Sequence, residues 1–382
     1  MGPAAKRILH IGGCAANIAA AAATLCAAYG GMVDPMVSTI PAIFAMSFPF
    51  WVGLVIALVV IDLLVKSRKM ALIPAGALIL CAGPLMSYAP VNLVKKDVAA
   101  QDSSKVFTLV SFNVANLIGT MTHLEASELY TAPGAPSNEI VDYIIGCGAD
   151  LVITQEFPPL TPNKYLGLSE AQIDTLLALY PHSLVPAFSK ETQNEHRCKI
   201  FSKFPLRRVA IPGCSGFSEW SAAMVDIRGT ETLVIDVHLQ SIGLTPKDRE
   251  LYVELTEGEG RGKMGEVRHT LLSKLSKAMR LRADQARELR HAIDSIGAPN
   301  VIVSGDFNDI PGCYAMRKIA GDNFRNAFND AANGPMITFH SDRFYFHIDH
   351  ILYRGAMEAV DLRRGDCSAS DHYPVRAAFL LE

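Results

Sequence analysis

Residues 301–311 carry the stretch VIVSGDFNDIP. Val301 to Val303 are β-branched and predict a buried strand, and Gly305 predicts a sharp turn of the backbone after it. Asp306 and Asn308 would then leave the strand end on a short loop. There a carboxylate can take a proton or orient water, and a carboxamide can donate a hydrogen bond to developing negative charge. An Asx-rich turn that only closes the strand fits this segment equally well.

Five further segments place polar side chains at the ends of strand-like runs. Their polar residues are Asn113, Glu156, His238, Asp349, and the adjacent pair Asp371 and His372. Glu156 follows the apolar run Leu151 to Ile153 and is a natural ligand for magnesium, which prefers one or two carboxylates with water and substrate oxygens. Asn113 can coordinate a hard cation or hold a carboxylate in place. Taken singly, a Glu in a loop is more often a solvated charge, and His238 is more often a structural histidine.

Asp349 is the more informative of these residues, because it lies in an apolar strand-like run, predicted at 347–353. A carboxylate there is costly unless another group pairs with it. The segment Ala369 to Val375 supplies a candidate partner, His372. Asp349 would fix the tautomer of His372 from behind, while His372 bonds a phosphoryl group.

With these six motifs in this order, residues 105–382 resemble the endonuclease/exonuclease/phosphatase superfamily. The whole chain would be a membrane-anchored bacterial member. The superfamily includes pancreatic deoxyribonuclease, abasic-site endonucleases, inositol-polyphosphate 5-phosphatases and bacterial sphingomyelinases. The pairing of GDFN at 305–308 with SDHYPV at 370–375 is the specific part of the match. The resemblance implies an α/β fold, a four-layered α/β sandwich of two packed mixed sheets flanked by helices. Strands and helices that mix without strict βαβ alternation agree with this architecture.

The resemblance also implies a role for each matching residue. A magnesium ion, with manganese as the alternative, would be bound by Asn113, Glu156 and Asp371. The implied catalytic residues are His238 as phosphate contact, Asp306 as base or orienter of water, Asn308 as transition-state donor, and Asp349 with His372 as a polarised pair. Candidate substrate contacts are Asn116 and Arg197; near Arg197 the chain departs from the Ser-Arg strand end common in the family.

Residues 1–90 have a different character, with three apolar stretches at 8–28, 40–65 and 70–88. A membrane span needs about 20 predominantly apolar residues; the second stretch meets this easily, the third just meets it, and the first is marginal. We therefore expect a membrane anchor of two or three transmembrane helices, the first being alternatively a signal peptide. A linker at 91–104 would join it to a catalytic domain at 105–382.

Charges near the apolar stretches predict the orientation. Lys6 and Arg7 precede the first stretch, and residues 66–69 carry three basic side chains between the second and third. Basic loops stay in the cytoplasm, so the chain should be a multi-pass protein of the inner or cytoplasmic membrane with an extracytoplasmic catalytic domain. Lys95 and Lys96 argue mildly for the opposite orientation.

The sequence gives one indication of binding partners, a basic segment. The segment 261–290 contains nine Lys or Arg residues against three acidic ones. It is either a solvated helix face or a patch for anionic lipid head groups or nucleic-acid phosphates.

We expect a phosphoesterase, phosphodiesterase or phosphatase, acting on nucleic acid or phospholipid, with no obligate protein partner implied. The alternative is a catalytically silent membrane-anchored binding module or scaffold. The eight cysteines show no metal-site spacing and predict buried thiols.

Overall fold

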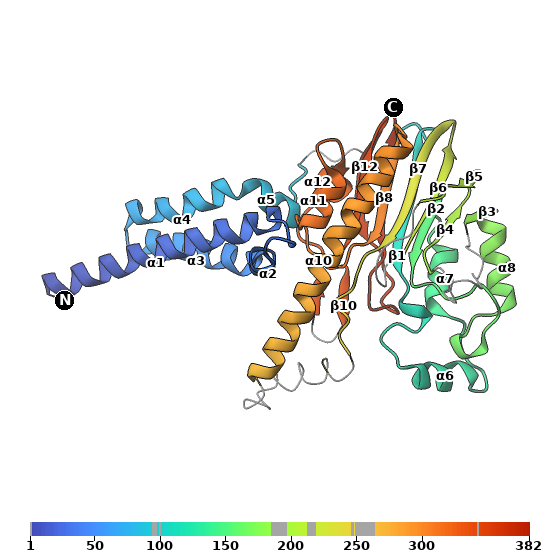
Figure 1. Cartoon of the computed structure of the whole chain (residues 1–382), viewed down its shortest axis with the longest axis horizontal. Coiled ribbons are helices and arrows are strands. Elements are labelled where there is room, and N and C mark those ends of the chain that lie inside the picture. Colours follow the sequence, from blue (N-terminus) through green and yellow to red (C-terminus); the bar gives the residue numbers. More distant parts are fainter. Residues whose placement is uncertain are drawn as a thin grey trace.

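The computed structural model describes residues 2–93, 98, 101–184, 197–211, 219–245, 248, 264–341 and 344–382. Figure 1 shows a rod of helices, residues 3–88, that projects from an α/β body, residues 106–382. The predicted linker is described only at 91–93, 98 and 101–104, so it lies largely outside the described residues.

The helical rod is built from packed helices that run back and forth. They are α1 (Pro3–Tyr29), the 3-10 turn η1 (Gly30–Met32), α2 (Ile40–Ala45), α3 (Phe48–Leu64), α4 (Arg68–Leu80) and α5 (Ala82–Tyr88). Helices α1, α3 and α4 lie side by side along the rod (Figure 1). Asn17 donates a hydrogen bond to Asp62 (2.6 Å) inside the rod, so each of these buried polar side chains has a partner.

The apolar stretches differ from the prediction in continuity. The first stretch, predicted to be marginal, contains the one described helix that is long and apolar enough to cross a bilayer, His10–Met32. The second stretch is divided into α2 and the 17-residue α3, with prolines in the first turn of both helices. Proline is favoured there because its missing N–H would be unbonded anyway. The third stretch is bent by 62° between α4 and α5 and is long enough only as a broken span.

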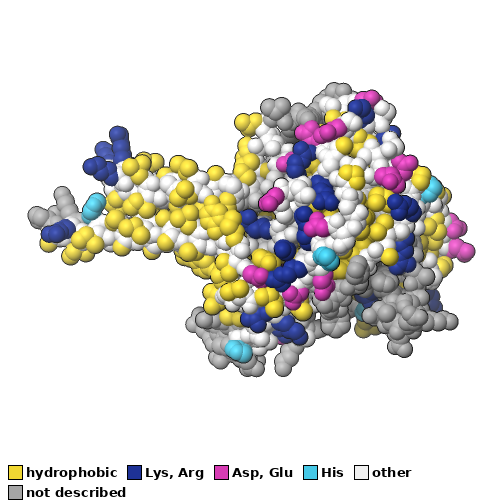
Figure 2. Space-filling view, turned by 45° about the horizontal axis from the view of Figure 1, so that its top comes forward, with side chains coloured by type: hydrophobic (Ala, Val, Ile, Leu, Met, Phe, Trp, Pro, Cys, Tyr) yellow, Lys and Arg dark blue, Asp and Glu magenta, His cyan; other side chains and the backbone are white. Residues whose placement is uncertain are grey.

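Hydrophobic side chains cover the surface of the rod (Figure 2). Val37, Leu64 and Ile79 are 81%, 76% and 75% exposed, and most large hydrophobic residues exposed in the described part of the chain lie before residue 94. The loop between α3 and α4 lies beside the N-terminus, at the end of the rod that points away from the body (Figure 1). That loop carries Lys66, and α4 begins with Arg68 and Lys69.

Two six-stranded sheets form the centre of the α/β body. The first has the order β13-β14-β1-β2-β4-β3 and the second the order β5-β6-β7-β8-β12-β9. The strands of the first sheet are β1 (Val106–Asn113), β2 (Leu151–Gln155), β3 (His182–Leu184), β4 (Lys199–Ser202), β13 (Met357–Arg364) and β14 (Val375–Leu381). Those of the second are β5 (Leu206–Arg208), β6 (Glu219–Ile227), β7 (Thr230–His238), β8 (Val301–Asp306), β9 (Arg325–Asn326) and β12 (Asp349–Arg354). A separate hairpin joins β10 (Phe339–Ser341) to β11 (Phe344–Phe346).

Helices cover the outer faces of both sheets, which confirms the predicted four-layered sandwich (Figure 1). The first sheet carries α7 (Glu139–Gly146) and α8 (Glu170–Leu179), and the second carries α10 (Met264–Ile296) and α11 (Tyr314–Ala320). The shorter elements are η3 (Ala115–Leu117), α6 (His123–Thr131), η4 (Lys164–Leu166) and α12 (Ala327–Ala331). Apolar side chains from the inner faces, such as Ile153 and Ile302, pack between the sheets. The central strands are buried on both faces, which explains their nearly continuous apolar sequences.

The structural role of Gly305 differs from the predicted one. It does not make a turn but lies within β8, paired with Val237 of the parallel strand β7. Its φ is +144°, and a Cβ atom at this position would lie 2.0 Å from the carbonyl oxygen of Val237. Glycine is needed because two backbones approach closely here. The strand predicted at 347–353 also begins two residues later than expected, at Asp349.

We expect Gly305→Ala to lower the free energy of unfolding by about 2–5 kcal/mol, because the new methyl group forces β7 and β8 apart and the backbone conformation is strained for alanine. Thermal and denaturant unfolding of the full chain in detergent would measure the loss. Gly334→Ala is the control: its φ is also positive, but nothing lies within 4 Å of the position of its Cβ atom. It should cost about 1–2 kcal/mol, the strain of the left-handed conformation alone. Equal losses for both variants would refute the close-approach explanation.

Candidate active site

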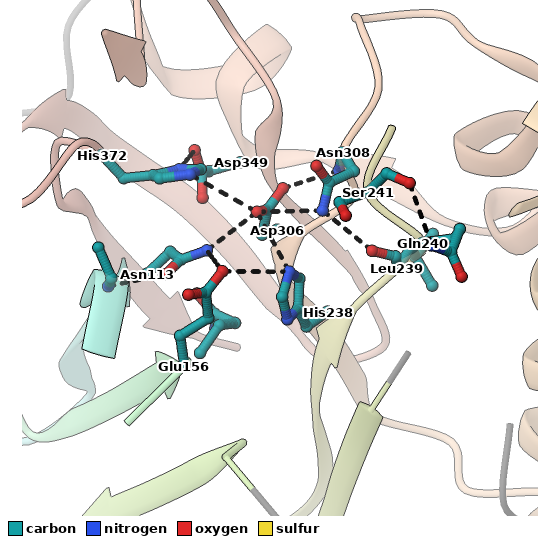
Figure 3. A network of polar contacts seen from close by, with 12 residues as sticks. Asn113, Glu156, His238, Leu239, Gln240, Ser241, Asp306, Asn308, Asp349 and His372 are labelled. Atoms are coloured by element: carbon teal, nitrogen blue, oxygen red, sulfur yellow. Dashed lines mark hydrogen bonds and ion pairs between the residues drawn. The ribbon is translucent and has the colours of Figure 1, made fainter. Parts of the chain in front are cut away.

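The ends of β1, β2, β7, β8 and the start of β12 meet at one edge of the two sheets. Strand register alone places His238 and Asp349 on either side of Asp306, because both pair with it across the sheet. From the other sheet, Asn113 at the end of β1 pairs with Gln155, the residue before Glu156. Figure 3 shows these side chains pointing toward one another.

Asp306 is the centre of this arrangement. Its Oδ2 accepts hydrogen bonds from the side-chain amides of Asn113 (3.0 Å) and Asn308 (3.3 Å), and its Oδ1 accepts one from the Asn308 backbone N–H (2.7 Å). The same Oδ2 lies 3.7 Å from Nε2 of both His238 and His372. Burial raises the pKa of Asp306 to about 6, against the opposing effect of His372. The carboxylate is thus fixed by neutral donors and placed between two imidazoles.

Glu156 forms the more open side of the site. Its Oε1 accepts from the Asn113 amide (3.3 Å) and lies 3.7 Å from Nε2 of His238, while its Oε2 accepts from Asn116 (2.9 Å). Glu156 adopts a left-handed backbone conformation with φ of +56°, which is uncommon for a residue with a side chain. Arg197 donates to the amide oxygen of Asn116 (2.8 Å). Asn116 therefore contacts Glu156, and Arg197 contacts Asn116.

Asp349 and His372 form the predicted pair. The Nδ1 atom of His372 lies 2.9 Å from Oδ2 of Asp349, and both side chains are buried. Burial alone would lower the pKa of His372, but the carboxylates of Asp349 and Asp306 raise it to about 10. The imidazole is therefore protonated near neutral pH, and Nε2 is the nitrogen directed to Asp306 and the centre of the site.

The donor set fits a hard divalent cation. Carboxylate oxygens of Asp306, Asp349 and a nitrogen of His372 lie within 4.8 Å of one another, but the bond between Asp349 and His372 occupies that pair. Glu156 is half-buried and lies beside His238 at the open side of the site, and carboxylate oxygen ligands suit magnesium. The amide oxygen of Asn113 accepts from the backbone N–H of Ala115 (3.1 Å), so its N–H groups face the carboxylates. Asn113 here holds the carboxylates, which is one of the two roles predicted for it.

Six of the ten candidate residues line one cavity of about 360 Å³. Its polar lining includes Glu156, His238, Asp306, Asn308, Asp371 and His372. Asp371 lies in the cavity wall, as a metal-binding role requires, while Asn308 also donates to the carbonyl of Leu239 (2.9 Å) and holds Asp306 in place. The structure thus brings the predicted catalytic and metal-binding residues to a single site, where Asn116 and Arg197 are peripheral.

Other buried polar contacts support this site and were not predicted from the sequence. The hydroxyl group of Ser370 donates to the carbonyl of Asn113 (2.7 Å), which ties the loop carrying His372 to the end of β1. Gln155 donates to Asp236 (2.7 Å) and links the two sheets directly beneath the site. Ser370 is the first residue of the SDHYPV motif, so its place beside His372 was the only available signal.

Four of the six basic side chains that are described in the segment 261–290 form ion pairs. Lys274 pairs with Asp248, Arg282 with Asp309, Arg287 with Asp34 and Asp284, and Arg290 with Asp294. Lys277 and Arg280 are exposed, whereas Arg261 and Lys263, like Lys95 and Lys96, lie outside the described residues. None of the seven cysteines in the described ranges forms a disulfide, four of them are buried, and Cys214 lies outside those ranges.

Comparisons with known proteins show what the chain is similar to. Residues 110–372 match the model of the Endonuclease/Exonuclease/phosphatase family, and residues 6–88 match a domain of unknown function, DUF8431. No curated protein sequence matches the chain. Among solved structures, it is similar to an endonuclease/exonuclease/phosphatase family protein from Bacteroides thetaiotaomicron, with 14% identity, a TM-score of 0.44, and coverage of 72% of this chain and 98% of the other. It is similar to TDP2 from Caenorhabditis elegans, with 16% identity, a TM-score of 0.43, and coverage of 72% and 98%.

The human Nocturnin catalytic domain is another similar structure, with 17% identity, a TM-score of 0.43, and coverage of 74% of this chain and 97% of the other. The family model itself spans more than half of the chain and includes Asn113, Glu156, His238, Asp306 and His372. The chain therefore belongs to the Endonuclease/Exonuclease/phosphatase family, a family of phosphoester hydrolases.

Proposed function

We propose that this protein is a divalent-metal-dependent phosphoester hydrolase that its N-terminal helices hold at a membrane. One observation carries the proposal: carboxylate, imidazole and amide side chains from separate strand ends line a single cavity. Water must attack a phosphorus atom shielded by anionic oxygens, so the reaction needs a cation and several positioned donors around the phosphoryl group.

Each residue of the site can perform one part of this reaction. Asp306, held by Asn113 and Asn308, accepts the proton of the attacking water as its oxygen bonds to phosphorus. His372, charged through its pairing with Asp349, donates from Nε2 to a phosphoryl oxygen, and His238 stands on the opposite side of Asp306. The ester P–O bond breaks, and the departing alkoxide takes a proton from solvent water and leaves as the alcohol. Glu156 would hold a magnesium or manganese ion, which would supply positive charge to neutralise the phosphoryl oxygens.

The arrangement of the rod supports an extracytoplasmic site. Its basic end, with Lys66, Arg68 and Lys69, is remote from the α/β body, and its surface between this end and the body is hydrophobic (Figures 1 and 2). Basic loops are retained in the cytoplasm, so the body would lie on the other side of the membrane. Three passes along the rod, by α1, by α3 and by the bent pair of α4 and α5, would bring the chain from a cytoplasmic N-terminus to a body on the other side.

Glu156→Gln should reduce hydrolysis of bis(4-nitrophenyl) phosphate by the full chain in detergent by a factor of about 100 or more, because losing one stabilising group of this kind costs about 3 kcal/mol in the transition state. It should also raise the magnesium concentration needed for half-maximal rate. Glu128→Gln, a change at an exposed position of α6, is the control. Wild-type protein that is inactive with both metals, and indifferent to Asp306→Asn, would favour the binding-module alternative.

Asp349→Asn should lower the pKa of His372 from about 10, because it removes the carboxylate nearest to the imidazole. The protonated form is then lost at lower pH, so the alkaline limb of the pH–rate profile moves down and the maximal rate falls by a factor of about 100 to 10,000. NMR titration of the His372 ring would measure the pKa directly. Asp366→Asn, an exposed change in the same loop, should alter neither quantity.

Fusion of reporters to the C-terminus tests the orientation. An alkaline phosphatase fusion should be active and a green fluorescent protein fusion dark, because only the phosphatase matures outside the cytoplasm. The reverse pattern would place the site in the cytoplasm, and it would contradict the assignment made from the basic loops.

A further inference from the structure

The cavity that contains the candidate catalytic residues extends well beyond them, and its remaining wall is apolar. The loop after β7 contributes Ile242 and Leu244, and α10 contributes Leu271 and Leu275. Leu271 and Leu275 are four residues apart in the helix, so they present one continuous apolar face. At about 360 Å³ the cavity falls within the range of roughly 300–1,000 Å³ typical of small-molecule sites.

The β10–β11 hairpin completes the apolar wall. Phe339, Phe344 and Phe346 all line the cavity. Phe339 also contacts the ring of His372, with ring centroids 4.9 Å apart. The hairpin thus joins the polar centre to the hydrophobic part of the cavity without a break.

The helical rod supplies the far edge of the same cavity. Met46, the residue that follows α2, lines it, and the neighbouring Ala45 packs into the core between the second sheet and α10. The side-chain oxygens of Thr39, at the start of α2, and Ser276 of α10 lie 3.0 Å apart and join rod to body. In Figure 2 the hydrophobic surface of the rod continues onto the adjoining part of the body. The apolar wall therefore begins at the catalytic residues and ends at the segment that meets the membrane.

Resting on the proposed hydrolase function, we propose that the cavity binds a lipid phosphoester. Its phosphate lies between Glu156, Asp306 and His372, and its hydrocarbon chain lies along Leu271, Leu275 and the hairpin toward Met46. A buried chain is stabilised by about 0.8 kcal/mol per methylene group, whereas a polar substituent in this part of the cavity would lose its hydration without gaining partners. Met46, which follows α2 of the rod, places the rod beside the apolar part of the cavity.

A nucleic-acid substrate fits this wall less well. Nucleic-acid sites track the phosphate backbone with Lys and Arg side chains, but the described lining contains one such residue, Arg282, which is buried and bonded to Asp309 (3.1 Å) and to the carbonyl of Gln240 (2.9 Å). Lys274, which lies between Leu271 and Leu275 in sequence, pairs with Asp248.

Two phosphodiesters with the same leaving group test the inference: methyl 4-nitrophenyl phosphate and dodecyl 4-nitrophenyl phosphate, with the full chain in lipid nanodiscs and magnesium. Wild-type protein should favour the dodecyl compound by at least tenfold in kcat/KM. Leu271→Gln and Leu275→Gln should each reduce that preference at least fivefold, through a lower kcat/KM for the dodecyl compound. Leu272→Gln is the matched control, because this neighbour does not line the cavity and is 38% exposed. Partitioning of the dodecyl chain into the nanodisc affects all variants alike.

The outcomes separate the two proposals. Equal rates for both compounds, or a preference that survives both substitutions, would overturn the lipid assignment while the hydrolase proposal stands. Binding of the dodecyl compound by calorimetry without hydrolysis of either compound would overturn the hydrolase and keep the apolar site, provided that Leu275→Gln weakens the binding. Nicking of plasmid DNA at a rate above that of the dodecyl compound would show that the natural substrate is a nucleic acid.

Discussion

The buried carboxylate of Asp306 is the constraint around which the active site is built. A charged group removed from water is costly unless neighbouring groups donate to it, and here the donors come from both sheets. Asn113 reaches it from β1, Asn308 from the loop after β8, and two imidazoles flank it. Because these partners belong to distant parts of the chain, the carboxylate is satisfied only when the two sheets are packed face to face. The site and the fold thus depend on the same contacts.

The helical rod is joined to the body through specific polar contacts and close packing. Asp34, in the connection after η1, accepts from Arg287 of α10 and from Tyr314 of α11 (3.0 Å), and a Cβ atom on Gly31 would lie 2.2 Å from the carbonyl oxygen of Gly312. These contacts hold the rod at a defined angle to the sheets. The opening of the cavity therefore has a defined position relative to the hydrophobic surface of the rod.

Strands and site residues were predictable where a chemical signal was strong. The apolar strands β1, β2, β7 and β8 are buried on both faces, and each ends in a polar residue. This polar residue is easy to identify in the sequence because an apolar run precedes it. Short edge strands such as β3, β5 and β9 lack such a pattern, because two or three residues cannot establish a period. The apolar wall was missed for a related reason: Leu271 and Leu275 are indistinguishable in sequence from residues of an ordinary helix core. The continuity of the apolar stretches was also misjudged, since prolines divide the second stretch into two helices.

The sequence by itself determined the chemistry: which carboxylates, imidazoles and amides follow buried strands, and that the first 90 residues are apolar. These properties are local, so composition and period reveal them. Tertiary structure decided the geometry: that Asn308 and Asn113 clamp Asp306, that Gly305 serves a close backbone approach, and that Met46 of the rod borders the catalytic cavity. Each of these depends on which strands and helices become neighbours in space. The arrangement of neighbouring elements follows from the packing of the whole chain, so it cannot be predicted from any single segment.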